Sequence, residues 1–358
     1  MKTLISLIVF LFLGSVASAA ENSGTVYDSA ILKEDVTWRG TVLVRGSVVV
    51  APHSTLRIEP GTVIRFAAAT ESRLSNLVIQ GRLHAAGTVE RPVVFTSEFS
   101  KMSRAAWGGL VFISTAKRNV IEQSRIENVD VGIDVRFSTI TLKGVSILHA
   151  ETAFSSQDGV VQAEDFRISG SETGALIFDS EFEGKNISVD SCKDGLIFNR
   201  SAFVLVSPKL LNNKRFGINS TESRVKITDG EFAANAVGAQ LKGGEGQIFM
   251  SAFLQNRDTA LHLNDARIRI ERCLFSENKK DALRVEDGRS LLFNNAFSAN
   301  TGFNLYNAGN EVVSARQNWW GGGDRDFIYG KIYDAAKNKN SGVVQIYPWL
   351  NEKPQLLP

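Results

Sequence analysis

Four charged side chains recur at a spacing that could bring them together. Lys143, Glu164 and Lys185 follow one another at intervals of 21 residues, and Glu183 lies two positions before the last of them. Converging carboxylates can bind Ca²⁺, and a neighbouring basic group can remove a proton from a sugar acid. Ca²⁺ requires about six to eight oxygen ligands, however, and only Glu164 and Glu183 converge. The alternating signs therefore favour a cross-strand charge ladder over a catalytic site.

A second set of outward-facing positions is apolar where polar residues are expected. It comprises Val204, Val206, Phe249, Leu291 and Phe293. A contiguous apolar strip can serve as a surface for a partner or as a platform on which sugar rings stack. The alternative is that the C-terminal tail after Trp319 folds back and covers the strip.

Signals for a metal or another cofactor are weak. Asp324 and Asp326 follow a run of three glycines and could ligate Ca²⁺, although a capping turn explains them better. The four histidines, which lack the spacing of metal ligands, are His53, His84, His149 and His262. We therefore expect no cofactor, with Ca²⁺ the one ion that these residues allow.

The elements that position these residues follow from a repeat. Phenylalanines recur at intervals of 21 or 22 residues, each followed three positions later by asparagine: Phe232, Phe253, Phe275 and Phe297, with Asn235, Asn256, Asn278 and Asn300. Asn213 fits the same frame one unit earlier. Within a unit such as residues 224–232, apolar and polar residues alternate with period two, which indicates strands.

Units of this size predict a single-stranded parallel β-helix, an all-β solenoid of 21–22-residue coils. The fixed Leu-x-x-Leu-x-Leu frame of leucine-rich repeats is absent, and no helical stripe suggests α-helical repeats. Successive coils then stack at about 4.8 Å, so that equivalent phenylalanines fill the interior. Equivalent asparagines form a hydrogen-bonded ladder, as they do in cross-β stacks.

The rest of the chain divides around this solenoid. Residues 1–19 have a positive start, an apolar core and an Ala-x-Ala end, which predicts a signal peptide and an exported protein, periplasmic or at the cell surface. We expect a tail over 20–30, irregular early coils with a cap over 31–119, regular coils over 120–316, and a closing coil with a tail over 317–358. No transmembrane segment is expected after signal cleavage, because the apolar run is too short to span a bilayer.

Charge and cysteine content bound the partners. The net charge is +2, from 40 basic and 38 acidic residues, and no basic block is present, which argues against nucleic-acid binding. The frame places Cys192 and Cys273 four coils apart, about 19 Å at the strand spacing, which is too far for a disulfide. We expect two unpaired, mostly buried thiols, which are unusual in an exported chain, and a monomer.

The two ends of the chain resemble known proteins. Trp38, Pro60-Gly61-Thr62 and Phe95-Thr96-Ser97 resemble the N-terminal part of bacterial exported right-handed parallel β-helix proteins, and Asn318-Trp319-Trp320-Gly321 resembles their closing coil. The fold is similar to that of the pectate-lyase-like superfamily. That grouping includes polysaccharide lyases, epimerases, adhesins and a periplasmic accessory protein, so the resemblance leaves the function open.

Three functional hypotheses remain. The first is a non-catalytic exported scaffold that binds a glycan or another envelope component along its side. The second is an enzyme, a lyase or epimerase acting on uronate polymers, with the charged set of Lys143, Glu164, Glu183 and Lys185 as its candidate residues. The third, which rests on the resemblance alone, is a periplasmic assembly accessory protein.

Overall fold

The computed structural model describes residues 24–67, 74–98, 104–286, 289–322 and 324–355. The expected signal peptide, 1–19, lies outside the described residues. Among the described residues, no helix is long and apolar enough to cross a membrane.

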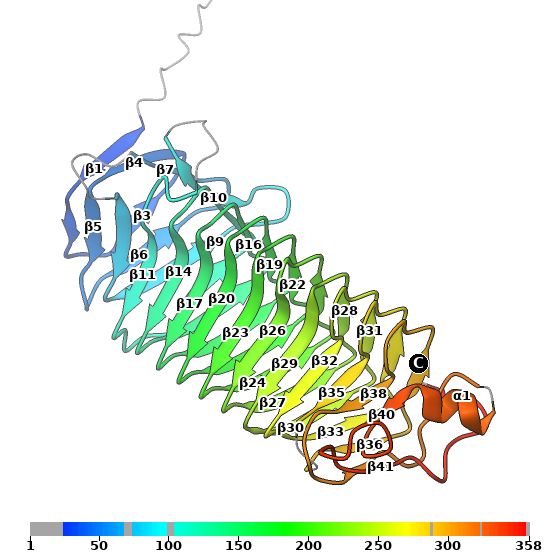
Figure 1. Cartoon of the computed structure of the whole chain (residues 1–358). Coiled ribbons are helices and arrows are strands. Elements are labelled where there is room, and N and C mark those ends of the chain that lie inside the picture. Colours follow the sequence, from blue (N-terminus) through cyan, green and yellow to red (C-terminus); the bar gives the residue numbers. More distant parts are fainter. Residues whose placement is uncertain (1–23, 68–73, 99–103, 287–288, 323, 356–358) are drawn as a thin grey trace, which may run out of the picture.

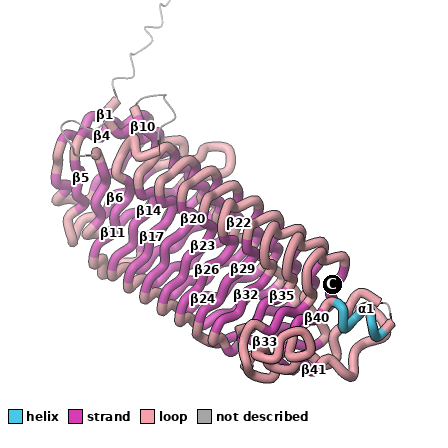
Figure 2. The backbone as a smooth tube through the Cα atoms, in the orientation of Figure 1, coloured by secondary structure: helices cyan, strands magenta, loops and turns pink. Residues whose placement is uncertain are grey.

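Three long parallel sheets run the length of an elongated molecule, and each turn of the chain contributes one strand to each sheet (Figures 1 and 2). Sheet A contains β1 (Thr25–Asp28), β4 (Thr41–Arg45), β7 (Val63–Phe66), β10 (Val93–Ser97), β13 (Ser124–Glu127), β16 (Ser146–Leu148), β19 (Arg167–Ser169), β22 (Ser188–Asp190), β25 (Lys209–Leu211), β28 (Glu231–Ala233), β31 (Ala252–Leu254), β34 (Leu274–Ser276) and β37 (Ala296–Ser298).

Sheet B contains β2 (Ile31–Leu32), β5 (Ser47–Val50), β8 (Asn76–Ile79), β11 (Gly109–Ile113), β14 (Val131–Arg136), β17 (Thr152–Gln157), β20 (Thr173–Phe178), β23 (Asp194–Asn199), β26 (Phe216–Thr221), β29 (Val237–Lys242), β32 (Leu261–Asn264), β35 (Leu283–Val285), β38 (Leu305–Asn307) and β40 (Ile332–Tyr333).

Sheet C contains β3 (Val36–Trp38), β6 (Thr55–Ile58), β9 (Arg82–Ala86), β12 (Asn119–Glu122), β15 (Thr139–Lys143), β18 (Val160–Glu164), β21 (Glu181–Lys185), β24 (Ala202–Val206), β27 (Arg224–Thr228), β30 (Glu245–Phe249), β33 (Arg267–Glu271) and β36 (Leu291–Phe293). The predicted all-β solenoid is confirmed.

Alternation within the strands separates the core from the surface. In β27, Val225 and Ile227 are buried, whereas Arg224 and Lys226 point outward and are exposed. Because β24, β27 and β30 pair without a shift in register, Lys226 lies between Val204 of β24 and Gln247 of β30. Each outward position therefore becomes one place in a row that runs along the solenoid axis.

Single residues in the left-handed conformation turn the chain at the corners between sheets. Arg200, Ser207 and Asn212 occupy the three corners of one coil, with φ of 46°, 51° and 55°. This conformation costs a non-glycine residue on the order of 1 kcal/mol. Hydrogen bonds between stacked corners offset the cost, since each corner amide donates to a carbonyl of the next coil, as Asn212 N does to Ala233 O at 3.0 Å.

Asparagine and phenylalanine stacks fill the corner between sheets A and B. The Asn213 side chain donates to Asn235 Oδ1 at 2.9 Å, and Asn235, Asn256, Asn278 and Asn300 continue this row with separations of 2.9–3.3 Å. Behind the amides, the buried rings of Phe232, Phe253, Phe275 and Phe297 stack at 4.6–4.9 Å. Burying each ring contributes roughly 2–3 kcal/mol to the hydrophobic stabilisation.

The first coil begins earlier than the sequence suggested. Residues 25–28, expected in a tail, form β1 and pair with β4. Tyr27 packs on Trp38 with ring centroids 5.1 Å apart, and Trp38 is 1% exposed. This aromatic pair closes the open end of the core, which explains why strand structure starts within the expected tail.

A short closing segment covers the other end. Trp320 stacks on Phe297 at 4.7 Å and is the last ring of the stack. The helix α1 (Arg325–Gly330) then leads into β40, while β39 (Val313–Ser314) pairs with β41 (Val344–Gln345). In Figure 1, this segment lies at the opposite end of the solenoid from β1.

Candidate functional site

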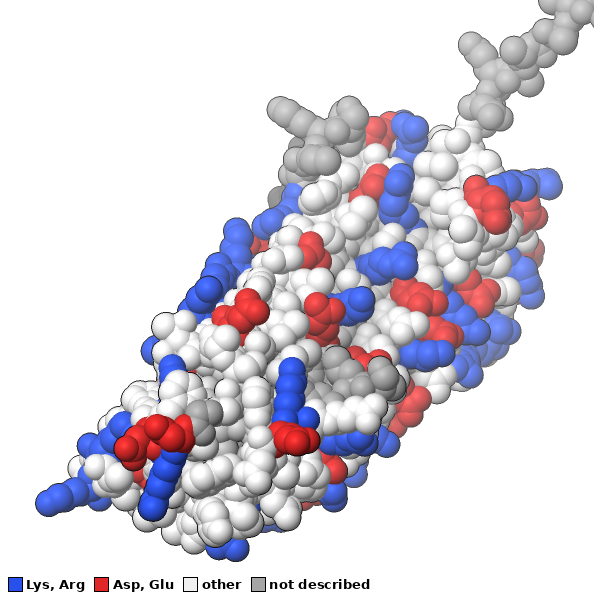
Figure 3. Space-filling model, turned by 90° about the vertical axis from the view of Figure 1, so that its right-hand side faces the viewer, with Lys and Arg blue, Asp and Glu red and all other residues white. Residues whose placement is uncertain are grey.

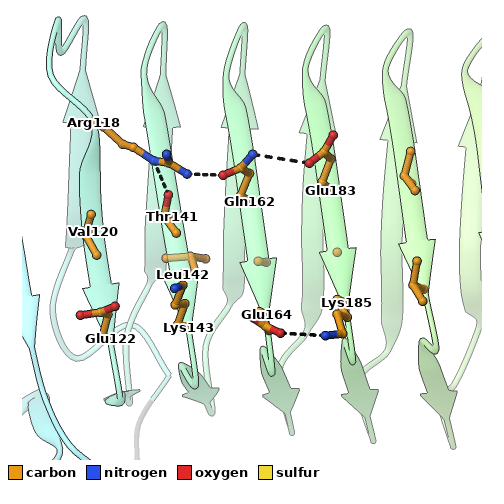
Figure 4. A pocket seen from close by; sticks show the side chains of 14 residues that line it. Arg118, Val120, Glu122, Thr141, Leu142, Lys143, Gln162, Glu164, Glu183 and Lys185 are labelled. Atoms are coloured by element: carbon orange, nitrogen blue, oxygen red, sulfur yellow. Dashed lines mark hydrogen bonds and ion pairs between the residues drawn. The ribbon is translucent and has the colours of Figure 1, made fainter.

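A groove of about 730 Å³ runs across β12, β15, β18, β21 and β24 on the outer face of sheet C. We call it the sheet C groove. Its lining includes the outward-facing Val120, Val204 and Val206 together with polar and charged side chains, whereas Leu142 and Ala163 beneath it belong to the buried core. Figure 4 shows that these polar side chains form two rows, one through the middle of the strands and one at their ends.

The row through the middle of the strands is hydrogen-bonded. Arg118 Nε donates to Thr141 Oγ1 at 2.7 Å, and the same guanidinium contacts the Gln162 side chain. Gln162 Nε2 reaches Glu183 Oε2 at 3.5 Å. These contacts hold one donor or acceptor per coil at the groove surface.

The second row alternates in charge along the strand ends. The register places Glu122, Lys143, Glu164 and Lys185 side by side. Lys185 Nζ lies 3.0 Å from Glu164 Oε1, and both side chains are largely exposed. Lys143 is exposed and has no hydrogen bond or ion pair with any residue that the structure describes. The four charged residues singled out from the sequence all line this groove: Lys143, Glu164, Glu183 and Lys185.

A second hollow of about 480 Å³ adjoins this groove at Val204, which lines both. We call it the basic hollow because Arg224, Lys226 and Arg267 surround it, with Glu245 as its one carboxylate. Glu245 lies 3.9 Å from Arg267. Within the described part of the chain, Arg224 and Lys226 have no hydrogen-bonding or ion-pair partner for their side chains. Six Lys or Arg and four Glu residues line the two hollows together.

The apolar set does not form one continuous strip. Val204 and Val206 line the sheet C groove, whereas Phe249, Leu291 and Phe293 lie farther along the same face. Lys226 and Thr228 of β27 separate the two parts, which breaks the contiguous strip that the sequence suggested.

Basic side chains, and not the tail alone, cover the aromatic part of this set. The guanidinium of Arg269 lies 4.8 Å from the centre of the Phe293 ring, and that of Arg272 lies 5.9 Å from Phe249. The tail reaches this region where Gln355 O accepts from Arg272 Nε at 3.4 Å. Leu291 remains 55% exposed.

The two aspartates considered for Ca²⁺ belong to α1. Asp324 is its N-cap and accepts a hydrogen bond from Phe327 N at 2.9 Å, and Asp326 lies in its first turn. An acceptor at this position satisfies an otherwise unpaired helix amide. Over the described ranges, no three His, Cys, Asp or Glu side chains are grouped as metal ligands.

Both cysteines are free and buried, but they occupy different corners. Cys192 N donates to Asn213 Oδ1, and Cys273 N donates to Asn295 Oδ1, each at the end of a separate asparagine row. Burial raises the pKa of Cys192 to about 11 and that of Cys273 to about 12. The prediction of unpaired, buried thiols is confirmed.

A further cluster on the outer face of sheet B escaped the sequence analysis. Glu286 Oε1 lies 3.1 Å from His262 Nε2 and 3.4 Å from Arg284 Nε, and Asn264 donates to its other oxygen. Partial burial opposes ionisation, but His262 and Arg284 hold the pKa of Glu286 below its ordinary value.

Aromatic rings extend the same cluster. Arg284 lies 4.6 Å from the centre of the Tyr306 ring, which stacks on Tyr333 at 4.1 Å. The sequence signal was available, because His262, Arg284 and Tyr306 are spaced by 22 residues. These three residues repeat on the outer face of sheet B, whereas the charged set repeats on that of sheet C.

Charges of both signs are interspersed on the face seen in Figure 3. No broad area of that face carries basic side chains alone, although individual rows do. This distribution matches the near balance of 40 basic and 38 acidic residues in the whole chain.

Comparisons with known proteins agree with this architecture. Residues 24–137 match a family model described as a pectate-lyase-like beta helix domain, and residues 173–318 match one described as a right-handed beta helix region. The chain is therefore a right-handed parallel β-helix protein with a pectate-lyase-like fold. The comparison with curated proteins found no match.

Several solved structures are similar at low sequence identity. One is a mutant of the periplasmic alginate epimerase AlgG, at 10% identity and a TM-score of 0.46, covering 88% of this chain and 76% of that one. Another is the Azotobacter vinelandii mannuronan C-5 epimerase AlgE6 A-module, at 11% identity and a TM-score of 0.41, with 93% of this chain and 92% of that one covered. A third is the Streptococcus pneumoniae surface protein and adhesin PfbA, at 10% identity and a TM-score of 0.33, with 76% of this chain and 90% of that one covered. Likeness at this level concerns the fold and not the function.

Proposed function

We propose that the protein binds an acidic polysaccharide along the outer face of sheet C without cleaving it. The observation that carries this proposal is the set of three exposed cations, Lys143, Arg224 and Lys226, none of which has a partner among the described residues. They line two adjoining hollows that together hold six basic residues and four carboxylates. An acidic polymer supplies the missing negative charges, and an exported protein would meet such polymers outside the cytoplasm.

The geometry suits a polymer better than a single sugar. From β12 to β33 the two hollows cross eight strands, which at the strand spacing is roughly 34 Å. Each exposed ion pair is worth only about 0–1 kcal/mol, so one contact would not hold a ligand. A chain that meets several cations in succession gains affinity from each contact after the first, because the later contacts are intramolecular.

A lyase or epimerase acting on uronate polymers is the second candidate. The observation that favours it is the ammonium group of Lys143, which has no partner in the described part of the chain and lies beside Glu164 in the groove. Against it, Lys185 neutralises Glu164 across 3.0 Å, and both groups face solvent. A general base must reach the proton that it removes, whereas this ion pair occupies the two side chains with each other.

Affinity electrophoresis of the full purified chain tests the proposal. Gels would contain polygalacturonate, polymannuronate or a neutral glucan, with Ca²⁺ or with a chelator. We expect retardation by an acidic polymer only, and a several-fold weaker interaction for Lys143→Ala and Lys226→Ala. Lys209→Ala removes a lysine that is also exposed, from sheet A, and serves as the control.

The same samples separate binding from cleavage. Ultraviolet absorbance would report unsaturated sugar products, and proton NMR would report epimerised residues. Either product, lost in Lys143→Ala and Glu164→Ala, would make the protein an enzyme. Equal mobility in all gels would remove the binding proposal and leave an assembly role as the surviving hypothesis.

A further inference from the structure

A second polar and aromatic surface lies on sheet B near the C-terminal end, where Figure 1 shows β32, β35 and β38 leading to β40. The strand register aligns one planar side chain from each of these strands: His262, Arg284, Tyr306 and Tyr333. We call this row the sheet B platform. All four side chains are partly exposed.

Stacking makes the platform rigid and leaves its edges available. The rings of Tyr306 and Tyr333 are stacked and nearly parallel, with 4° between their planes, and Phe303 meets both rings edge-on at 5.8 and 5.3 Å. Glu286 fixes Arg284 through Nε, so the terminal amino groups of the guanidinium remain without a partner among the described residues. Planar donors and phenol groups repeated at about 4.8 Å match the hydroxyl-rich edge of a saccharide chain.

A third hollow connects this platform to sheet C. This corner hollow, of about 460 Å³, shares Glu245 and Arg267 with the basic hollow. It also includes Asn264, whose amide donates to Glu286 beside the platform. The three hollows and the platform therefore form one path around the corner between sheets B and C.

Two glycines, Gly243 and Gly244, line the corner hollow where this path passes from sheet B to sheet C. The corresponding corner of other coils carries a side chain, as at Arg200, Glu222 and Asp265, all in the left-handed conformation. Here the corner is Gly243, with φ of 65°, followed by Gly244. A Cβ at Gly243 would meet nothing closer than Glu222 Cγ at 3.5 Å, so close packing does not require the glycine.

We propose that an acidic polysaccharide bound on sheet C continues over the Gly243 corner and makes a second set of contacts with the sheet B platform. This inference rests on the proposed function, and it assigns a second saccharide site to the same polymer. An oligosaccharide of about 35 Å fills the sheet C groove and the basic hollow alone. A longer chain also reaches the platform and binds more tightly because its later contacts are intramolecular.

Titration calorimetry of the full chain with acidic oligosaccharides of graded length tests this inference. For the longer chains, we expect Tyr306→Ala and Arg284→Ala to weaken binding about tenfold, which is typical of truncating an aromatic or arginine anchor. Binding of the 35 Å oligosaccharide should not change. Gly243→Asn, which tolerates the left-handed corner but fills it, should reproduce the loss for long chains. Tyr329→Ala removes another arginine-stacked tyrosine, outside the platform, and should have no effect.

Each failure has a separate meaning. If Tyr306→Ala and Arg284→Ala bind long chains as the wild type does while Lys226→Ala weakens binding, the second site is refuted and the sheet C proposal stands. If Tyr306→Ala weakens binding and Lys226→Ala does not, the ligand occupies sheet B alone, and the continuous path is refuted. If no acidic saccharide binds the wild type, both proposals fall. Unchanged thermal unfolding of each variant would show that the losses arise from contacts and not from misfolding.

Discussion

At the scale of single residues, the buried thiols make folding sensitive to alkaline pH. Unfolded cysteine ionises near its ordinary pKa of 9.0, whereas burial keeps Cys192 and Cys273 protonated up to about pH 11 and about pH 12. The folded state therefore binds more protons than the unfolded state above pH 9.0, and stability falls as pH rises.

We expect the two thiols to lower the free energy of unfolding as pH rises from about 9 to about 10.5, each by about 1.4 kcal/mol per pH unit. Urea unfolding of the wild type and of the Cys192→Ala/Cys273→Ala double variant across this range measures the effect. The double variant serves as the control for the wild type, because all other groups titrate equally in both proteins. Parallel pH dependences would contradict the assignment.

Single residues also show what the sequence could and could not reveal. The 21-residue interval placed Lys143, Glu164 and Lys185 in one row, because a solenoid converts sequence period directly into neighbourhood. Period alone could not show that Lys185 pairs with Glu164 while Lys143 has no partner among the described residues, since that depends on side-chain rotamers. Arg200 and Ser207 at left-handed corners were equally hidden, because neither residue type favours that conformation.

At the scale of the elements, the asparagine row is the part most sensitive to substitution. Asn256 is fully buried; its Nδ2 donates to Phe232 O at 2.9 Å and its Oδ1 accepts from Asn235 N at 3.1 Å. Removing this side chain leaves a carbonyl and an amide unpaired in the interior, which costs about 1–3 kcal/mol for each group.

Asn256→Ala should therefore lower the free energy of unfolding by about 3 kcal/mol or more, as measured by urea denaturation. Asn351→Ala, at an exposed position in the tail, should change it by less than about 0.5 kcal/mol. A loss below about 1 kcal/mol for Asn256→Ala would mean that water replaces the amide and that the row is not a major source of stability.

At the same scale, the sheets were easier to predict than the exceptions to them. Alternation in segments such as Arg224–Thr228 identified strands, and the recurrent Phe and Asn gave the coil length. The capping role of Asp324 was predicted, but the six-residue helix α1 that it begins, with Asp326 in the first turn, was not. The platform of His262, Arg284 and Tyr306 follows the same period, but a solenoid has three outer faces and period alone does not say which of them carries a site.

At the scale of the whole molecule, the closing segment protects the open end of the solenoid. Trp320 covers Phe297, and β40 pairs with β38, so the last regular coil exposes neither its ring stack nor that strand edge. Uncovered edges of parallel strands are templates for association with another chain.

A chain ending at Arg316 should therefore self-associate, whereas one ending at Asn351 should elute as the full chain does. Size-exclusion chromatography with light scattering compares the three proteins at equal concentration. The control ending at Asn351 loses part of the tail but keeps Trp320, β40 and β41, so a difference between the two truncated chains reports the loss of the cover. A compact monomer for the chain ending at Arg316 would show that the last coil needs no cover.

Because each coil stacks on the one before it, the number of coils sets the length of the molecule. Duplicating a block of 21 or 22 residues would lengthen all three faces together by one step of about 4.8 Å, without a new turn or a new core. The length of the outer face therefore depends on how many repeats the sequence contains. A binding face for a longer ligand can arise by duplication of a repeat, before any residue is substituted.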